Sequence, residues 1–199
     1  MGDDSKVFGM SADAGRWIFV FLGMVVNFCL GAVYVYSVFK KPLEELFKIS
    51  ATQGGLPYAT FLAMFALFTF VAGKFIDKLG PRKVMMVGGA LVGIGWILTY
   101  FASSITMVVL TYGVIGGAGV GIVYGGPVSV ATRWFPDKKG LAVGLALAGF
   151  GGSGVATAPI ASALISQYGP LGAFGIMGIA FFFITIILAI PMKFPPAGY

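Results

Sequence analysis

The sequence predicts an all-α membrane protein with six transmembrane helices. Of its 199 residues, 58% are hydrophobic and only 10% are charged, whereas a soluble domain carries about 25% charged residues. The apolar residues form six uncharged runs of about 20 residues, each long enough to cross a bilayer core of about 30 Å at about 1.5 Å per residue. The basic residues lie between these runs. We therefore expect a multi-pass protein of the cell (inner) membrane, with the lipid bilayer as its first partner.

The six expected spans divide the chain into three parts. Residues 1–16 are polar and form a cytoplasmic N-terminal segment, residues 17–192 form the six-helix bundle, and residues 193–199 begin a cytoplasmic linker. The first span has no small-residue cleavage site, so it is expected to be a helix and not a secretory signal. Residues 40–50 are expected to extend it as a short amphipathic helix. The spans, none of which contains a charged residue, are Trp17–Phe39, Gly55–Gly73, Val84–Ala102, Thr106–Val130, Gly140–Ile165 and Leu171–Met192.

The distribution of Lys and Arg predicts which side of the bundle faces the cytoplasm. With the N-terminus inside, ten basic residues lie on the inner side and three, Lys40, Lys41 and Lys48, on the outer side. Basic residues accumulate in the cytoplasmic loops of membrane proteins, so both termini are expected in the cytoplasm. The net charge of +6 then reflects topology. Nucleic acid is not an expected partner, because the basic residues form no patch with interleaved aromatics.

The densest charge cluster of the chain lies in residues 73–83, between two uncharged runs. It holds four basic residues and one acid, punctuated by glycine and proline, which is typical of a tight turn on the positive side of a bilayer. The order Gly-x-x-x-Asp-x-x-Gly-x-Arg, formed by Gly73, Asp77, Gly80 and Arg82, closely resembles the signature between helices 2 and 3 of the major facilitator superfamily of transporters. The resemblance implies one half of a twelve-helix fold.

The same resemblance implies that this turn takes part in conformational gating. Asp77 is expected near the end of the second helix, where its carboxylate meets the positive N-terminus of a neighbouring helix, pairs with Arg82, or pairs with Arg133 of the next inner loop. Such contacts, framed by Gly73 and Gly80, would close the inner face in one state and break in the other. We therefore expect Asp77→Asn to weaken the outward-facing state.

Two further sets of residues resemble a narrower branch of that superfamily. The pattern x-Leu-Ala-x-Gly-x-Ala-x-Ala-Gly, preceded by an aromatic pair and two basic residues, is similar to the helix 5 signature of the monocarboxylate transporters; its positions are Trp134, Phe135, Lys138, Lys139, Leu141, Ala142, Gly144, Ala146, Ala148 and Gly149. Residues 15–17, 34–43, 133–138 and 194–199 resemble the prokaryotic oxalate/formate antiporter family. The resemblance implies transport of small organic anions such as oxalate, formate, lactate or pyruvate, by antiport or proton symport through alternating access.

Neutral side chains at membrane depth are the candidates for contact with such an anion. Asn27, Gly31 and Tyr34 follow the i, i+4, i+7 spacing of one helix face, and Tyr124 follows three glycines spaced four apart. The tyrosines would donate hydroxyls to a carboxylate, Asn27 would support them, and Leu145 would form an apolar wall. Simpler roles stay open: interhelical bonding for Asn27, helix packing for the glycines and an aromatic belt for Tyr124.

The spans contain no charged side chain that would neutralise that anion. A carboxylate moved to mid-membrane with only a few hydroxyl donors is strongly disfavoured, and the resemblance implies that the cationic residues lie mainly in the second half of such transporters. We therefore expect this chain to need a second six-helix half or a homodimer mate. The alternative is a membrane module without a ligand of its own, either a non-transporting assembly partner or an inert truncated fragment.

An enzyme is not expected from this sequence. Histidine is absent, Cys29 is the single cysteine, and no acid lies inside a span. These absences leave no His-based metal site and no nucleophile paired with a base, so neither a metal nor another cofactor is expected.

Overall fold

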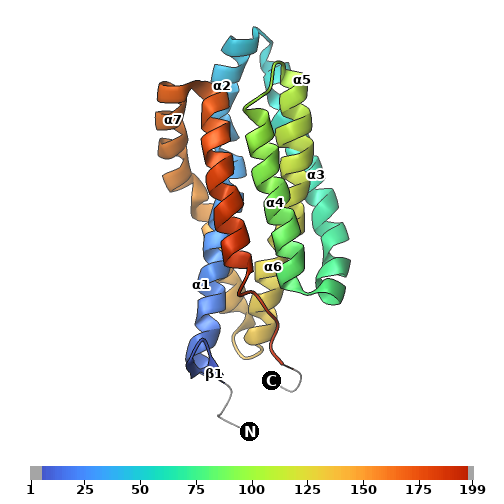
Figure 1. Cartoon of the computed structure of the whole chain (residues 1–199), viewed down its shortest axis with the longest axis vertical. Helices are drawn as coiled ribbons and strands as arrows, with labels where there is room; N and C mark the ends of the chain where they lie inside the picture. The colour runs from blue at the N-terminus through green and yellow to red at the C-terminus, as the bar shows by residue number, and fades with distance from the viewer. Residues whose placement is uncertain (1–5, 197–199) are drawn as a thin grey trace.

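The computed structural model describes the chain from residue 6 to residue 196 and shows an almost entirely helical protein (Figure 1). Two short antiparallel strands, β1 (Lys6–Val7) and β2 (Met10–Ser11), come first. The helices that follow are α1 (Ala12–Leu30), the 3-10 segment η1 (Gly31–Val35), α2 (Tyr36–Phe47), α3 (Ala51–Leu79), α4 (Pro81–Thr99), α5 (Ile105–Val108), the π-helical segment η2 (Val109–Gly116), α6 (Gly117–Trp134) and α7 (Lys139–Ala189). The predictions for residues 1–5 and 197–199 lie outside the described residues.

Five continuous helical segments are long and apolar enough to cross a membrane: Ala12–Phe47, Ala51–Leu79, Pro81–Thr99, Ile105–Trp134 and Lys139–Ala189. The last has 51 residues, which in a straight helix would span about 75 Å, more than twice the thickness of a bilayer core. It reverses at Gly169, where φ is 72° and ψ is 170°, and Figure 1 shows its two parts running antiparallel. With α7 counted as two segments, 139–168 and 170–189, the described bundle has the six apolar segments that the sequence predicts.

The observed segments differ from the expected spans at their boundaries, and α3, for example, covers Ala51–Leu79 where the sequence predicts Gly55–Gly73. α1 begins at Ala12 rather than at Trp17, and the β1–β2 pair precedes it. The described part of the N-terminal segment is therefore folded against the start of the bundle. α7 ends at Ala189 rather than at Met192. Hydropathy locates a span along the chain, but capping and fraying decide where its helix begins and ends.

Local sequence fixes the turns between the segments. Ser50 and Gln53 form a capping box at the start of α3. Gly80 ends α3 with a φ of 81°, a conformation that disfavours residues with a Cβ, and Pro81 begins α4, where its missing N–H is not needed. α2 continues the first helix as the sequence predicts and buries Leu43 completely.

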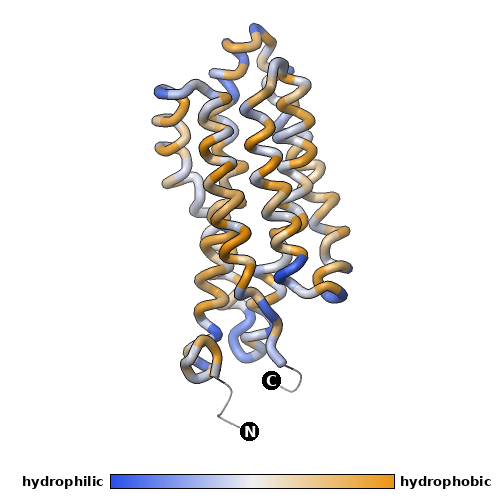
Figure 2. The backbone as a smooth tube through the Cα atoms, in the orientation of Figure 1, coloured by the Kyte–Doolittle hydropathy of each residue, from blue (hydrophilic) through white to orange (hydrophobic). Residues whose placement is uncertain are grey.

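The helices pack through glycine-lined contacts. The first part of α7 lies on α1 and its second part on α4, whereas α6 lies against both α3 and α4. A Cβ at Gly113, Gly117 or Gly121 would meet backbone carbonyl oxygens of α3, so these glycines pack helices together. Figure 2 shows hydrophobic residues along the helices and hydrophilic residues gathered at the two ends of the bundle.

Candidate functional site

The α3–α4 turn lies at the same end of the bundle as the β1–β2 pair, the α6–α7 loop and the residues that follow α7 (Figure 1). We call this end, formed by residues 6–16, 77–83, 133–139 and 190–196, the basic end. It carries most of the chain's Lys and Arg residues. Both parts of the site that the sequence analysis associates with gating therefore belong to one surface.

Asp77 at the basic end pairs with Arg133. The Arg133 Nη2 donates to Asp77 Oδ1 at 2.6 Å, and the Arg133 guanidinium lies 3.8 Å from the centre of the Phe194 ring. Of the partners left open for Asp77, the structure thus selects Arg133; among the described residues, Arg82 has no carboxylate within 4.0 Å. The two paired side chains are 66% and 45% exposed, and exposed pairs contribute at most about 1 kcal/mol. This is a contact that a conformational change can break at little cost.

The two glycines of the turn have different surroundings. Gly80 is required by its positive φ. Gly73 lies in a helix, and a Cβ built there would have no described atom within 4 Å. Nothing inside the described chain therefore demands a glycine at this position.

Arg16 forms a second cluster at the basic end that the sequence analysis did not assign. Its guanidinium donates to both carboxylate oxygens of Asp137 at 2.9 and 3.1 Å and to the Trp134 carbonyl at 3.2 Å. It also pairs with Asp13 at 3.0 Å and lies 4.5 Å from the centre of the Phe135 ring. The Arg16 side chain is only 12% exposed. This hydrogen bonding from Arg16 holds the pKa of Asp137 below its ordinary value.

Aromatic rings extend the Arg16 cluster into the bundle. Trp17 packs on Phe135 with ring centres 4.6 Å apart, and Phe19 stacks on Trp134 at 4.9 Å. The Trp134 indole donates to the Lys193 carbonyl at 2.8 Å. The runs at 15–17 and 133–138, noticed in the sequence only as a family resemblance, are thus two sides of one contact. The sequence of neither run reveals this contact, because the two runs lie more than a hundred residues apart.

Asn27 lies in the interior, where it joins α1 to α7. Its Nδ2 donates to the Ala146 carbonyl at 2.9 Å, and the side chain is fully buried. Among the described residues its Oδ1 has no hydrogen-bond partner. The face that the spacing of Asn27, Gly31 and Tyr34 predicts is directed at α7, because a Cβ at Gly31 would meet the Phe150 carbonyl oxygen. In this conformation Asn27 is an interhelical tie.

The two candidate tyrosines meet at a single aromatic ring. Tyr34 contacts Phe150 with ring centres 5.4 Å apart, and Tyr124 contacts Phe150 and Phe65 at 5.2 Å each. Tyr34 is half exposed, so part of this residue faces outside the bundle. Leu145 is 39% exposed on the first part of α7. The structure therefore brings Tyr34 and Tyr124 together and leaves Leu145 on an open face.

Tyr36, a residue that the sequence analysis did not single out, lies in the interior of the bundle. It is 3% exposed, its hydroxyl donates to the Gly54 carbonyl at 2.8 Å, and it stacks on the fully buried Tyr112. Tyr112 lies in the π-helical segment η2, a kind of irregularity that is common at functional sites. No local sequence pattern marks this pair, because its burial depends on how three helices meet.

Comparison with known proteins defines the family. A sequence model of the Major Facilitator Superfamily matches residues 10–198. The chain belongs to the major facilitator superfamily. It is therefore a membrane-integral protein of a transporter family, as the turn at residues 73–83 implied, and this family is not a family of enzymes.

Relatives within this superfamily agree with the narrower resemblance. The chain is 32% identical to the oxalate:formate antiporter of Oxalobacter formigenes over 181 residues, which cover 90% of the chain and 43% of the antiporter. It is 29% identical to monocarboxylate transporter 2 of Rattus norvegicus over 176 residues, 87% of the chain and 36% of that transporter. It is 28% identical to the uncharacterized MFS-type transporter YhjX of Escherichia coli over 91% of the chain and 45% of that protein. The chain thus spans less than half the length of these relatives from the superfamily.

Proposed function

We propose that this chain forms half of a secondary active transporter for small organic anions, such as oxalate, formate or monocarboxylates like lactate, which works by alternating access. The observation that carries the proposal is the 32% identity to an oxalate:formate antiporter along 90% of the chain. The half-exposed Tyr34, whose ring shares Phe150 with Tyr124, supports it, because tyrosine hydroxyls can donate hydrogen bonds to a carboxylate.

The electrostatics of the bundle support a need for a second half. All four ion pairs among the described residues lie at the ends of the bundle, and the spans are neutral. A carboxylate in the membrane interior requires a compensating cation. In our proposal that cation comes from a second six-helix half or from a homodimer mate.

Two exposed apolar faces support the same conclusion. On α3, Phe70 is 75% exposed, and on the first part of α7, Val155 is 84% exposed. Glycines beside Val155 at 151, 152 and 154 would accept a Cβ without meeting any described atom within 4 Å. Small residues on such a face allow another helix to approach closely. The proposed partner half packs on these faces, with the basic end in the cytoplasm according to the distribution of Lys and Arg.

Uptake of labelled oxalate, formate and lactate into liposomes tests the proposal. The purified chain alone is expected to give no uptake above protein-free liposomes, because it lacks the counter-charge. Co-reconstitution with a six-helix half that carries Lys or Arg within its spans is expected to restore uptake, and Tyr34→Phe with Tyr124→Phe to reduce it about tenfold or more, as expected for lost hydrogen bonds to a charged group. Robust uptake by the monomeric chain would contradict the need for a partner. Failure of every assembled form would favour the assembly partner or inert fragment.

We also propose that the Asp77–Arg133 contact closes the basic end in the outward-facing state. Asp77→Asn is expected to raise the reactivity of cysteine probes at the basic end by a few fold in the assembled transporter, because an exposed pair contributes at most about 1 kcal/mol. The exchange Asp77→Arg with Arg133→Asp is expected to restore the original reactivity. Arg82→Gln serves as the matched control, since Arg82 has no carboxylate within 4.0 Å among the described residues. Equal effects of Asp77→Asn and Arg82→Gln would show that this contact does not gate.

A further inference from the structure

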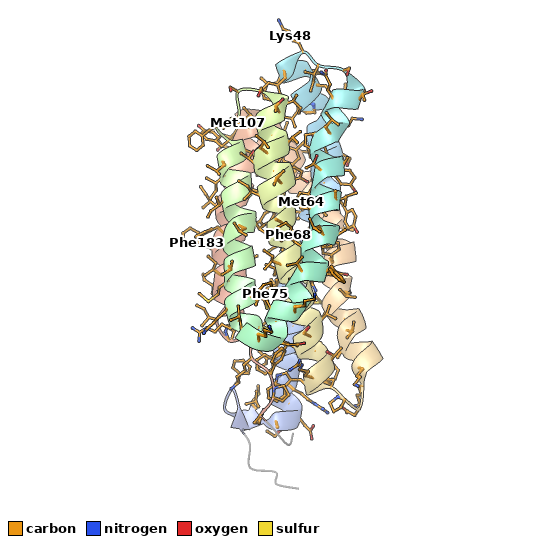
Figure 3. The ribbon with its side chains drawn as sticks, turned by 90° about the vertical axis from the view of Figure 1, so that its right-hand side faces the viewer. Lys48, Met64, Phe68, Phe75, Met107 and Phe183 are labelled. Atoms are coloured by element: carbon orange, nitrogen blue, oxygen red, sulfur yellow. The ribbon has the colours of Figure 1, made fainter. Side chains whose placement is uncertain are left out.

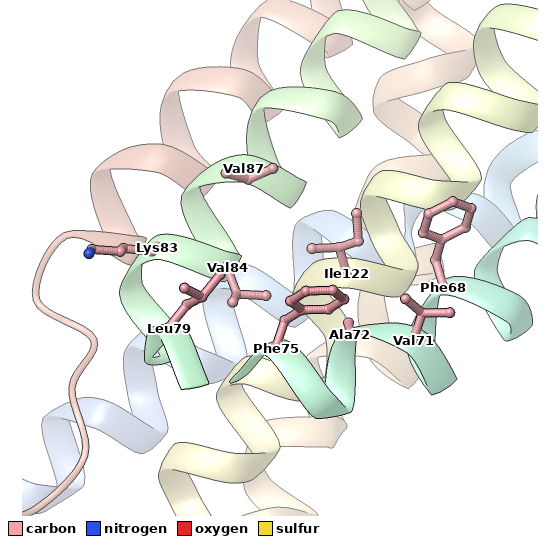
Figure 4. Close-up of a pocket in the computed structure, with 9 residues that line it drawn as sticks. All are labelled: Phe68, Val71, Ala72, Phe75, Leu79, Lys83, Val84, Val87 and Ile122. Carbon is pink, nitrogen blue, oxygen red and sulfur yellow. The ribbon is translucent and has the colours of Figure 1, made fainter. Parts of the chain in front are cut away.

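An open groove separates α3 from α4 next to the basic end. It has a volume of about 260 Å³, and eight of its nine lining residues are apolar. Phe68, Phe75 and Leu79 line it from α3, Val87 from α4, and Ile122 of α6 lies at its floor (Figure 4). The ninth lining residue is Lys83.

The groove opens outward from the bundle. Phe75, Leu79 and Val87 are 49%, 53% and 59% exposed, so these large apolar side chains are left uncovered by the described chain. Figure 3 shows Phe68 and Phe75 along α3 on the way to the α3–α4 turn, with Lys48 at the opposite end of the bundle. In a membrane, such a surface is in contact with lipid acyl chains.

The length of the groove matches one leaflet of a bilayer. Phe68 and Leu79 are eleven positions apart on the continuous helix α3, which corresponds to about 16 Å along the helix axis. Half of a hydrocarbon core of about 30 Å is about 15 Å. A single acyl chain would therefore lie along the groove with its headgroup at the α3–α4 turn.

The mouth of the groove carries positive charge that the chain does not neutralise. The stem of Lys83 lines the groove, and Figure 4 shows its ammonium directed away from the apolar side chains. Lys78 and Arg82 lie on the same turn. Among the described residues, none of these three has a carboxylate within 4.0 Å, and the nearby Asp77 is paired with Arg133.

We propose that this groove is a binding site for one acidic phospholipid, whose acyl chain lies along Phe68, Phe75 and Leu79 and whose phosphate contacts Lys83. Each basic residue near an anionic membrane surface contributes attraction, and a phosphodiester without its own cation complements the unpaired charges at the mouth. An apolar helix of a protein partner would cover the groove but would leave Lys83 without a counter-ion. The proposed function places the basic end in the cytoplasm, and only the choice of leaflet for this lipid depends on that orientation.

A second groove provides a natural control. It has a volume of about 470 Å³, lies between α4 and the second part of α7, and is lined by apolar residues together with Tyr100 and Tyr168 but by no charged residue. Its size suits an acyl chain equally well. We therefore expect it to accept lipids without preference for an acidic headgroup.

Native mass spectrometry of the purified chain tests this site with phosphatidylglycerol and phosphatidylcholine of identical acyl chains. The wild-type chain is expected to retain one phosphatidylglycerol preferentially. Lys83→Gln is expected to weaken that binding about fivefold, the order of magnitude for one basic residue near an acidic lipid. Val87→Trp, which fills the groove at an exposed position, is expected to weaken it as well. Lys48→Gln and Ile176→Trp, placed at the opposite end and in the second groove, are expected to leave it unchanged.

Several results would overturn the site. Equal retention of the two lipids, or an unchanged preference in Lys83→Gln, would contradict the proposed contact between Lys83 and the lipid headgroup. Displacement of the lipid by inorganic phosphate at millimolar concentration would show that the groove does not hold the acyl chain. A disulfide between Val87→Cys and a second protein half would identify a helix as the occupant. None of these outcomes depends on anion uptake, so the lipid site and the transport function fail separately.

Discussion

Replacing Gly149 by alanine is expected to destabilise the bundle by about 1–3 kcal/mol, the usual effect of overpacking a close contact. A Cβ at this position would fall on the Met24 carbonyl oxygen of α1, so α1 and the first part of α7 must move apart. The free energy of unfolding in mixed micelles, measured by denaturant titration, gives the result. Gly144→Ala is the matched control on the same helix, because its Cβ would meet no described atom within 4 Å.

The expected change for Gly144→Ala is within about 0.5 kcal/mol of zero. A double-mutant cycle adds a sharper test. Asn27 donates to Ala146 one turn before Gly149, so separating the helices also disrupts that bond. Asn27→Leu and Gly149→Ala are therefore expected to be non-additive. Equal effects of the two glycine substitutions, or strict additivity with Asn27→Leu, would contradict the close packing of α1 on α7.

Arg16→Gln is expected to produce the second large effect, a loss of about 1–3 kcal/mol from its bond to the Trp134 carbonyl and its contact with the Phe135 ring. The Arg16 side chain is 12% exposed and holds the α6–α7 loop against the start of α1. Unfolding in the same micelles provides the measurement. Arg82→Gln removes the same kind of group from a position with no described carboxylate partner, and its expected effect is within about 0.5 kcal/mol. Equal losses in the two variants would contradict the role of Arg16.

The contribution of Asp137 to the stability of the folded chain is expected to disappear in acid. Hydrogen bonding from Arg16 lowers the pKa of Asp137. The carboxylate therefore stays ionised to a lower pH in the folded chain than in the unfolded chain. Such a group adds stability above its unfolded pKa and loses it as the pH falls through the lower folded pKa. The difference in stability between wild type and Asp137→Asn should stay constant from about pH 8 to pH 5 and shrink below about pH 4. A difference that grows on acidification would contradict this linkage.

The sequence predicts the positions of the six spans because hydropathy acts on each segment independently. It also predicts the turn at Gly80 and Pro81, since a positive φ and a helix start have local signatures. It does not predict that the helix begins at Ala12, because the β1–β2 pair that precedes it depends on contact with the bundle. Hydropathy along the sequence therefore predicts where the helical segments lie better than it predicts the residues at which they begin and end.

The candidate site divides in the same way. The spacing of Asn27, Gly31 and Tyr34 predicts one helix face, and the structure shows that this face meets α7. The sequence offers three kinds of partner for Asp77 and does not choose between them, because Arg82 and Arg133 carry the same group on different elements. Tertiary packing makes the choice by bringing the end of α6 to the end of α3.

The sequence by itself determined that this chain is a membrane bundle with neutral spans, because charge and hydropathy are properties of the residues alone, and the motif at residues 73–83 indicated the transporter family by resemblance. Only the tertiary structure decided which side chains meet: Arg16 with Asp137, Arg133 with Asp77, and the two tyrosines at Phe150. Only the structure also left the groove beside Lys83 open between α3 and α4. The physical reason is that contacts between residues far apart in the chain depend on the separation and rotation of whole helices, which are set by close packing at glycines such as Gly149 and not by any local pattern.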